Sequence, residues 1–336
     1  MIAAEWGMTV GFVLLLLGFE YLVQVRRSHE PSFKEAAWWS VFYIAVAIVF
    51  GLTMLLWRDG QSAAEFFAGY VTEKSLSVDN LFVFLVILSR FAVPKIHRQR
   101  VLMFGVVLAL ILRLIFILIG AAAVSAFSWV FYLFGLFLLW TAVGVARGGV
   151  EEEEEYRENW ILRQVSKVLP SSKRYHGTAL VVREKGKRLV TPLLMVMIAI
   201  GSTDVLFAFD SIPAIFGLTT DPFIVFAANA FALMGLRQLF FVVHGLLKRL
   251  IYLSYGLAVI LTFIGVKLVL HALHENGLPF INGGEPVEGV PMIGIEVSLT
   301  VILVTLAITA IASGWSTRRT RRKLRLKGYR GGEPGK

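Results

Sequence analysis

The chain of 336 residues is 57% hydrophobic and 17% charged, has a formal net charge of +10 and contains no cysteine. A mean hydropathy of +0.73 excludes a soluble domain of this length and indicates a polytopic membrane protein. In such a chain the basic excess is a topology signal, so we expect the lipid bilayer as a partner and no nucleic acid. The lack of cysteine excludes thiolate metal sites and thiol redox chemistry, which leaves hard, oxygen-rich ligation.

About nine apolar segments of roughly 20 residues, the length that a helix needs to cross a bilayer, follow one another along the chain. They lie near residues 6–25, 38–57, 63–90, 101–122, 127–146, 190–215, 222–243, 252–273 and 294–315. The predicted fold is an all-α polytopic membrane protein. Of the Lys and Arg residues in the connections and the tail, 27 lie on one side of the membrane and one, Arg58, on the other. This bias predicts a multi-pass protein of the bacterial cytoplasmic membrane with its N-terminus outside and its C-terminus in the cytoplasm.

The chain divides into six predicted parts. These are two N-terminal helices in 1–62, a three-helix unit in 63–146, a cytoplasmic loop in 147–189, a second three-helix unit in 190–273, an outer loop and last helix in 274–315, and a basic cytoplasmic tail in 316–336. Residues 1–25 lack a basic start and a small-residue cleavage site, so we interpret them as the first helix and not as a signal peptide.

The motif S-x-D-x-L-F-x-F occurs twice, beginning at Ser77 and again, 125 residues later, at Ser202. Arg113 and Arg237 follow the two motifs at an offset of 124, and glycines in the third helix of each unit repeat at an offset of 121. Because the units begin at the third and the sixth helix, they enter the membrane from opposite sides. We therefore predict an inverted repeat of two three-helix units, an architecture of secondary transporters that bind their substrate between the units.

Five acidic residues fall within apolar segments, where a carboxylate costs about 3 kcal/mol near the membrane centre. They are Glu20, Glu73, Asp79, Asp204 and Asp210. A chain that repeats this cost is expected to use the charges on an ion or proton pathway. The predicted metal ligands are the two motif carboxylates at the centre and three neighbouring groups, namely Asp79, Asp204, Asp210, Asn80 and Glu73.

A regular helix does not bring these groups together. Glu73, Ser77 and Asn80 share one helix face, whereas Asp79 lies about 120° away from it. Pro213 removes a backbone donor shortly after the second motif, so we expect a broken helix there, with freed carbonyls near the ion.

Seven further residues are candidates for supporting roles: Lys74, Arg113, Arg237, Glu20, Asn229, Ser77 and Ser202. The three basic residues pair with carboxylates, either as fixed neutralising charges or as partners that exchange during gating. Glu20 either joins the pathway or extends to the membrane interface, and Asn229 either contacts the ion or bonds to another helix.

Carboxylate, amide and carbonyl oxygens suit Mg²⁺, Ca²⁺ or Mn²⁺ better than metals that prefer imidazole or thiolate. We expect the ion to be a transported substrate, with no permanently bound cofactor. The patterns H-E-x-x-H and G-x-S-x-G and the P-loop are absent, so the chain is not expected to be an enzyme.

The runs at residues 70–94 and 191–237, YVTEKSLSVDNLFVFLVILSRFAVP and TPLLMVMIAIGSTDVLFAFDSIPAIFGLTTDPFIVFAANAFALMGLR, resemble the two signature regions of the TerC/Alx family of bacterial integral membrane proteins. The resemblance covers most of residues 6–315. It implies manganese efflux, links the chain to tellurite resistance and alkaline response, and carries over the same five predicted ligands. One departure is Gly201, where some relatives have an acidic residue, which puts the ion selectivity of the site in question.

Together these features predict a secondary transporter that exports a hard divalent cation, with Mn²⁺ as the expected substrate, driven by proton exchange or membrane potential. The alternative is a non-transporting membrane scaffold, or a metal-delivery or stress-response partner associated with tellurite resistance. That alternative would involve other membrane or stress-response proteins, with the cytoplasmic loop as the docking surface.

Overall fold

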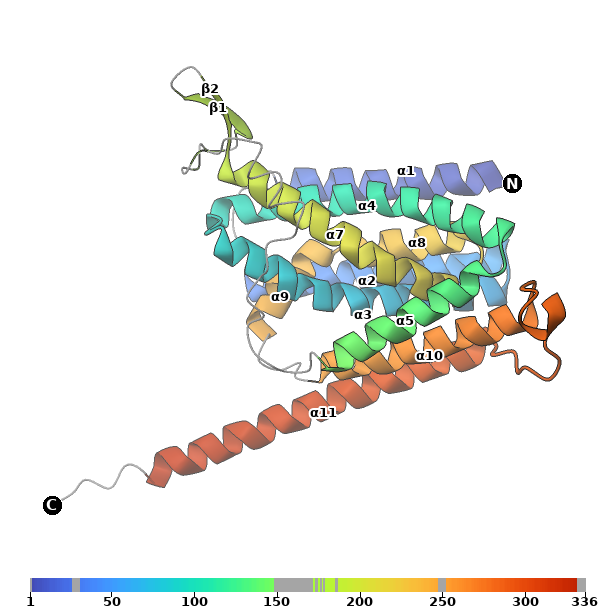
Figure 1. The fold of residues 1–336 in the computed structure, drawn as a ribbon. Coiled ribbons are helices and arrows are strands. Elements are labelled where there is room, and N and C mark those ends of the chain that lie inside the picture. Colours follow the sequence, from blue (N-terminus) through green and yellow to red (C-terminus); the bar gives the residue numbers. More distant parts are fainter. Residues whose placement is uncertain are drawn as a thin grey trace.

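The computed structural model describes residues 2–25, 31–147, 172, 175, 177, 179–184, 187–246 and 252–330. The predicted loop at 147–189 and the tail at 316–336 therefore lie partly outside the described residues. The helices and strands are α1 (Ile2–Glu20), the π-helix η1 (Tyr21–Val25), α2 (Phe33–Trp57), α3 (Gly60–Arg90), α4 (Lys95–Ala126), α5 (Val130–Arg147), β1 (Val181–Glu184), β2 (Lys187–Val190), α7 (Pro192–Phe216), α8 (Pro222–Leu233), α9 (Leu236–Leu246), α10 (Leu253–His274), the 3₁₀ turn η3 (Asn282–Gly284) and α11 (Ile295–Arg330). The two short strands form an antiparallel hairpin just before α7 (Figure 1).

The predicted all-α membrane fold is confirmed, with a correction to the number of spans. Within the described ranges, seven helices are long and apolar enough to cross a membrane, and the bent pair α8 and α9 makes an eighth. The remaining predicted segment is α3, which has 31 residues and a length of about 46 Å. Glu73, Lys74 and Asp79 lower its apolarity, so its place in the bundle depends on partners for these charges.

Capping residues mark the helix starts that border the site. The Thr191 hydroxyl accepts a hydrogen bond from the Leu194 amide, and Asp221 does the same for Phe223, each just before a proline at the first helical position. Asp59 caps α3 by accepting from the Ser62 amide at 2.6 Å. These caps fix where α3, α7 and α8 begin.

The helices of residues 60–147 pack against those of residues 192–274. Helix α3 contacts α7 and α8, α4 contacts α7 and α8, and α5 runs alongside α10. In Figure 1, α3 runs toward the β-hairpin end of the bundle and α7 runs away from it. Helix α11 packs on α10 and α3 and continues beyond the bundle.

Helices α5 and α10 approach closely at Gly135 and Gly265. A Cβ atom on Gly135 would lie 2.8 Å from the Gly265 carbonyl oxygen, and one on Gly265 would lie 3.0 Å from that of Gly135. Small residues let helix backbones approach in a membrane, where van der Waals packing replaces hydrophobic driving force. This contact therefore locks α5 to α10.

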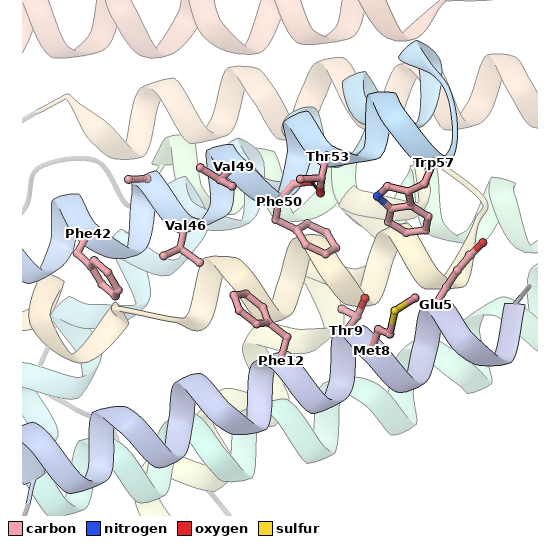
Figure 2. A pocket seen from close by; sticks show the side chains of 11 residues that line it. Glu5, Met8, Thr9, Phe12, Phe42, Val46, Val49, Phe50, Thr53 and Trp57 are labelled. Atoms are coloured by element: carbon pink, nitrogen blue, oxygen red, sulfur yellow. Dashed lines mark hydrogen bonds between the residues drawn. The ribbon is translucent and has the colours of Figure 1, made fainter.

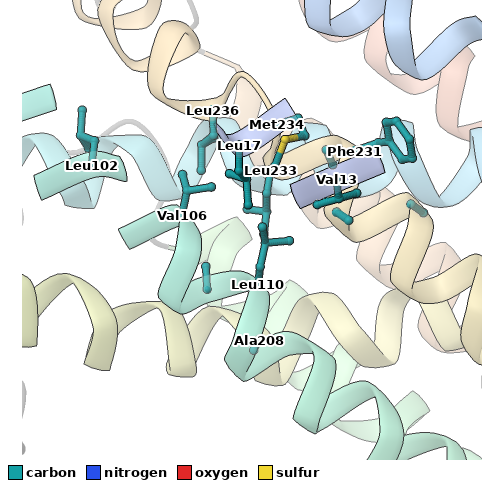
Figure 3. Close-up of a cluster of buried hydrophobic side chains, with 14 of the residues drawn as sticks. Val13, Leu17, Leu102, Val106, Leu110, Ala208, Phe231, Leu233, Met234 and Leu236 are labelled. Carbon is teal, nitrogen blue, oxygen red and sulfur yellow. The ribbon is translucent and has the colours of Figure 1, made fainter. Parts of the chain in front are cut away.

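The larger apolar core surrounds the point where α8 gives way to α9. Figure 3 shows Leu102, Val106 and Leu110 of α4 on one side and Leu233 and Met234 on the other. Side chains of α1 close the same cluster. The bend between α8 and α9 is thus enclosed by packed side chains.

Candidate functional site

Arg113 is the centre of a buried polar network that joins four helices. It lies in α4 and is 1% exposed. One terminal nitrogen, Nη1, donates to Glu73 Oε1 of α3 and, at 2.7 Å, to Asn229 Oδ1 of α8. The other, Nη2, lies 3.6 Å from Asp204 Oδ1 of α7. A guanidinium can be buried here because charged and polar acceptors surround it.

Two hydrogen bonds orient the acceptors of Arg113. The Ser77 hydroxyl donates to Glu73 Oε1 at 3.3 Å, one helical turn away. The Asn229 amide nitrogen donates to the Val225 carbonyl at 3.1 Å, which turns its oxygen toward Arg113. Ser77 and Asn229 therefore support the network.

The second oxygen of each buried carboxylate is left available. Glu73 Oε2 and Asp204 Oδ2 are buried and have no hydrogen-bond partner among the described residues, and the same is true of the Ser211 hydroxyl on α7. A buried polar atom without a partner costs roughly 1–3 kcal/mol, more when it is charged. Such atoms, supplied by α3 and α7, are suited to a ligand that brings positive charge.

The structure shows no contact of the other predicted ligands with Arg113 among the described hydrogen bonds and ion pairs. Asp79 lies in α3, but its side chain is outside the described part of the structure; Asn80 and Asp210 are partly buried. The Ser202 hydroxyl bonds back to the Ala199 carbonyl of its own helix at 3.1 Å. Among the described side chains no three His, Cys, Asp or Glu groups converge as a metal site.

The predicted break at Pro213 is wrong. Helix α7 continues through Pro213 to Phe216, and the Gly217 amide bonds to the Pro213 carbonyl beyond it. The discontinuity lies instead between α8 and α9, whose axes differ by 41°.

Arg237, the repeat partner of Arg113, forms a separate buried network. Its Nε donates to Glu20 Oε1 at 2.8 Å, and the Gln238 amide donates to the same oxygen at 3.0 Å. Glu20 is 2% exposed, so the interpretation that it extends to the membrane interface is wrong. Arg237 neutralises a residue of α1 that lies outside both predicted units.

Lys74 binds backbone oxygens, with no carboxylate among its hydrogen-bond partners in the described part of the structure. Its Nζ donates to the Ala232 carbonyl at 2.9 Å and to the Met234 carbonyl at 3.1 Å. In place of the predicted charge pairing, the described contacts of Lys74 lie at the end of α8.

The charged residues Glu73, Arg113, Asp204 and Arg237 all lie in a region that matches a known protein family. The model of the integral membrane protein TerC family matches residues 58–321. The chain belongs to this family. An uncharacterised membrane protein of Mycobacterium tuberculosis (strain H37Rv), Rv2723, is 50% identical over 316 residues, covering 93% of this chain and 79% of that protein. Alx of Escherichia coli (strain K12), named as a proposed membrane-bound redox modulator, is 37% identical over 319 residues, covering 92% and 94%. No solved structure matches the chain.

The position at which this TerC protein departs from some relatives is closely packed. A Cβ atom on Gly201 would lie 2.4 Å from Leu108 Cδ2 of α4. Any side chain at Gly201 must therefore displace the end of Leu108, which explains why glycine and leucine fit together here.

A third charged cluster of the TerC protein was missed at the sequence level. Arg58 donates to Glu5 of α1 and to Asp221 before α8, and its guanidinium lies 4.8 Å from the Phe223 ring centroid. Burial alone would lower the pKa of Arg58, but the hydrogen bonds to the two carboxylates outweigh it, and the pKa is raised. One sign of this cluster is present in the sequence: Arg58 is the single basic residue in the connections on one side of the membrane.

Glu5 also borders a cavity of about 650 Å³ between α1 and α2. Figure 2 shows Phe12 and Phe50 facing it along its length, with Trp57 at one end. Its lining is almost wholly apolar and comes from α1 and α2, so it is distinct from the network around Arg113.

Proposed function

We propose that this TerC family member is a secondary transporter that exports a hard divalent cation, with Mn²⁺ as the expected substrate, across the bacterial cytoplasmic membrane. The observation that carries the proposal is the pair of unpartnered, buried carboxylate oxygens, Glu73 Oε2 and Asp204 Oδ2, on helices α3 and α7. Oxygen ligands of this kind select Mn²⁺, Mg²⁺ or Ca²⁺ over softer metals.

The charge of the intramembrane residues supports a cationic substrate. The apolar segments carry five carboxylates, at Glu20, Glu73, Asp79, Asp204 and Asp210, and four basic residues, Lys74, Arg113, Arg237 and Lys267, oppose them. With every group ionised, the balance is −1. Charge left without compensation in a membrane interior is expensive, so the excess of carboxylates favours binding of a cation or of protons.

Arg113 supplies the counter-charge when the substrate is absent. It bonds directly to Glu73 but is held more loosely by Asp204, at 3.6 Å. An arriving cation competes with the guanidinium for these carboxylates, and Arg113 shifts its hydrogen bonds toward Asn229 as the ion binds. Protonation of the carboxylates releases the ion, which would couple export to proton entry.

The packing of the helices supports alternating access through two inverted units, α3 to α5 and α7 to α10. Contacts between the units occur in matched pairs: α3 with α8 corresponds to α4 with α7, and α5 with α7 corresponds to α3 with α10. Glu73 and Asp204 come from opposite units. Rocking of one unit against the other therefore opens the carboxylate pair to either side in turn. The basic residues of the connections support a cytoplasmic C-terminus.

Manganese transport in proteoliposomes tests the proposal. The purified chain is reconstituted with a Mn²⁺-sensitive dye inside, and Glu73→Gln and Asp204→Asn are compared with wild type. We expect both variants to lose at least about tenfold in rate, since each removes a ligand charge worth over 1.4 kcal/mol. Ser202→Ala is the matched control, because that hydroxyl bonds only to its own helix.

Equal transport by wild type, Glu73→Gln and Asp204→Asn would contradict the proposal. A wild type that moves no ion under a proton gradient while still protecting cells against metal or alkaline stress would favour the scaffold role. The chain has no cysteine, so a redox effect such as the name of Alx suggests would not use thiols of its own.

A further inference from the structure

The helix pair α8 and α9 is interrupted at Met234 and Gly235, whose backbone is not helical. Met234 is extended, with φ −60° and ψ 132°, and Gly235 has φ +74°. A Cβ atom on Gly235 would lie 2.9 Å from the Cβ of Tyr43 on α2. Glycine is therefore required twice, for its positive φ and for the close approach of Tyr43.

The break places oppositely charged groups at its two half-helix ends. The end of α8 presents the Ala232 and Met234 carbonyls, and the Lys74 ammonium binds both at 2.9 and 3.1 Å. The first turn of α9 carries Arg237 and Gln238, which hold the Glu20 carboxylate. A cation at a helix C-terminus and an anion at a helix N-terminus each match the local helix dipole.

We propose that the α8–α9 break is a binding site for a small monovalent cation, and that the Lys74 ammonium is its tethered occupant in this conformation. Two converging backbone carbonyls at a helix C-terminus form the kind of oxygen environment that discontinuous transporter helices offer to Na⁺ or H⁺. An ammonium group and an alkali cation can use the same carbonyl oxygens.

The site is linked to the carboxylate pair through the chain itself. Lys74 directly follows Glu73, which bonds to Arg113. Departure of Lys74 from the break therefore moves the backbone that positions Glu73. This coupling rests on the proposed transport of a divalent cation. Binding of a monovalent cation at the break is independent of that proposal.

Chemical rescue of a truncated lysine tests the binding site. Purified Lys74→Ala is unfolded by heat at constant ionic strength while N-methyl-D-glucamine chloride is replaced stepwise by methylammonium, sodium or potassium chloride. We expect Lys74→Ala to have a lower unfolding midpoint than wild type. Methylammonium, which matches the missing end of the side chain, should recover at least half of the loss in a saturable manner, because a ligand that binds only the folded state stabilises it.

Lys267→Ala is the matched control. Lys267 is another lysine of a membrane helix, but its Nζ donates to the Ser298 hydroxyl and not to helix carbonyls. No saturable rescue is expected for this control or for the wild type. If Lys74→Ala does not fold, Lys74→Met, whose side chain ends one atom short of the ammonium, takes its place with sodium and potassium as the probes. A variant that gains no more from the three cations than Lys267→Ala does would overturn the proposal.

Manganese transport measured on the same preparations separates the two proposals. Rescue of the unfolding midpoint with no manganese transport by the wild type leaves the monovalent site standing and removes the exporter. Transport by the wild type with no cation-dependent rescue does the reverse. If both hold, methylammonium should also restore at least part of the transport rate of Lys74→Ala.

Discussion

Replacement of Arg113 by methionine tests the central network most directly. Methionine keeps much of the side-chain volume but removes the charge that Glu73 and Asp204 share. Removing one partner of a buried ion pair costs about 3–5 kcal/mol, because the other charge stays buried and uncompensated. Asn229→Ala removes only a polar interhelical contact, for which membrane proteins show about 0.6 kcal/mol and at most about 1.7. We therefore expect Arg113→Met to destabilise the protein several times more than Asn229→Ala.

A double-mutant cycle turns this ranking into a test. The free energy of unfolding is measured by titration with denaturing detergent in mixed micelles for Arg113→Met, Glu73→Gln and the double variant. Since the two side chains bond directly, the double variant should be more stable than the sum of the single losses predicts, by at least about 1 kcal/mol. Additive losses within about 0.5 kcal/mol would refute the buried ion pair as the element that holds α3, α4 and α7 together.

Further predictions concern the break, the third cluster, the cap and the closely packed glycine. Gly235→Ala should lower the free energy of unfolding by about 1–3 kcal/mol, because alanine resists a φ of +74°, whereas Gly144→Ala in α5, with open space around it, should not destabilise. Arg58→Met should destabilise the protein by leaving Glu5 and Asp221 without their shared cation; Asp221→Asn combined with it should recover part of the loss, and an unchanged detergent midpoint for Arg58→Met would contradict this. The Ser62 amide holds the pKa of Asp59 below its ordinary value, so the stability from this cap is complete above that ordinary value and is lost as the pH falls through the lowered pKa. Asp59→Ala should therefore reduce the acid dependence of the unfolding midpoint, and an identical pH profile would argue against the cap. Gly201→Glu alone should disturb packing, while Gly201→Glu with Leu108→Ala should fold and bind Mn²⁺ more tightly than wild type, as measured by titration of the purified protein.

Much of the fold could be predicted because apolar length is a strong signal in membrane proteins. All nine predicted segments are helical in the structure, including the charged α3. The segment 222–243 differs from its prediction. It is one apolar run in the sequence but forms two half-helices in the structure. In the sequence, Gly235 is the only sign of this break, and it is a weak one because glycine is common in membrane helices. Pro213 gave the stronger signal for a break, yet α7 continues through it to Phe216.

The site could be predicted only in part, because the partners of a buried charge are set by the three-dimensional packing of helices that are distant in the sequence. Repeat symmetry suggested equivalent roles for Arg113 and Arg237, yet one bonds to Glu73 and the other to Glu20. Glu20 belongs to α1, which has no counterpart in the predicted units. Likewise, Arg58 unites residues 53 and 163 positions away, a contact that no local pattern encodes.

The two arginines that follow the repeated motifs have unequal partners. Arg113 bridges the carboxylates of Glu73 on α3 and Asp204 on α7, whereas Arg237 and Gln238 share one carboxylate of α1. A bond to α1 fixes α9 to a helix outside residues 60–274, while Lys74 of α3 holds the last carbonyls of α8. Because Lys74 directly follows Glu73, which bonds to Arg113, a shift at the end of α8 would change both cation environments at once. We therefore expect movement of α8 relative to α9 to centre on Gly235, where the two helices meet.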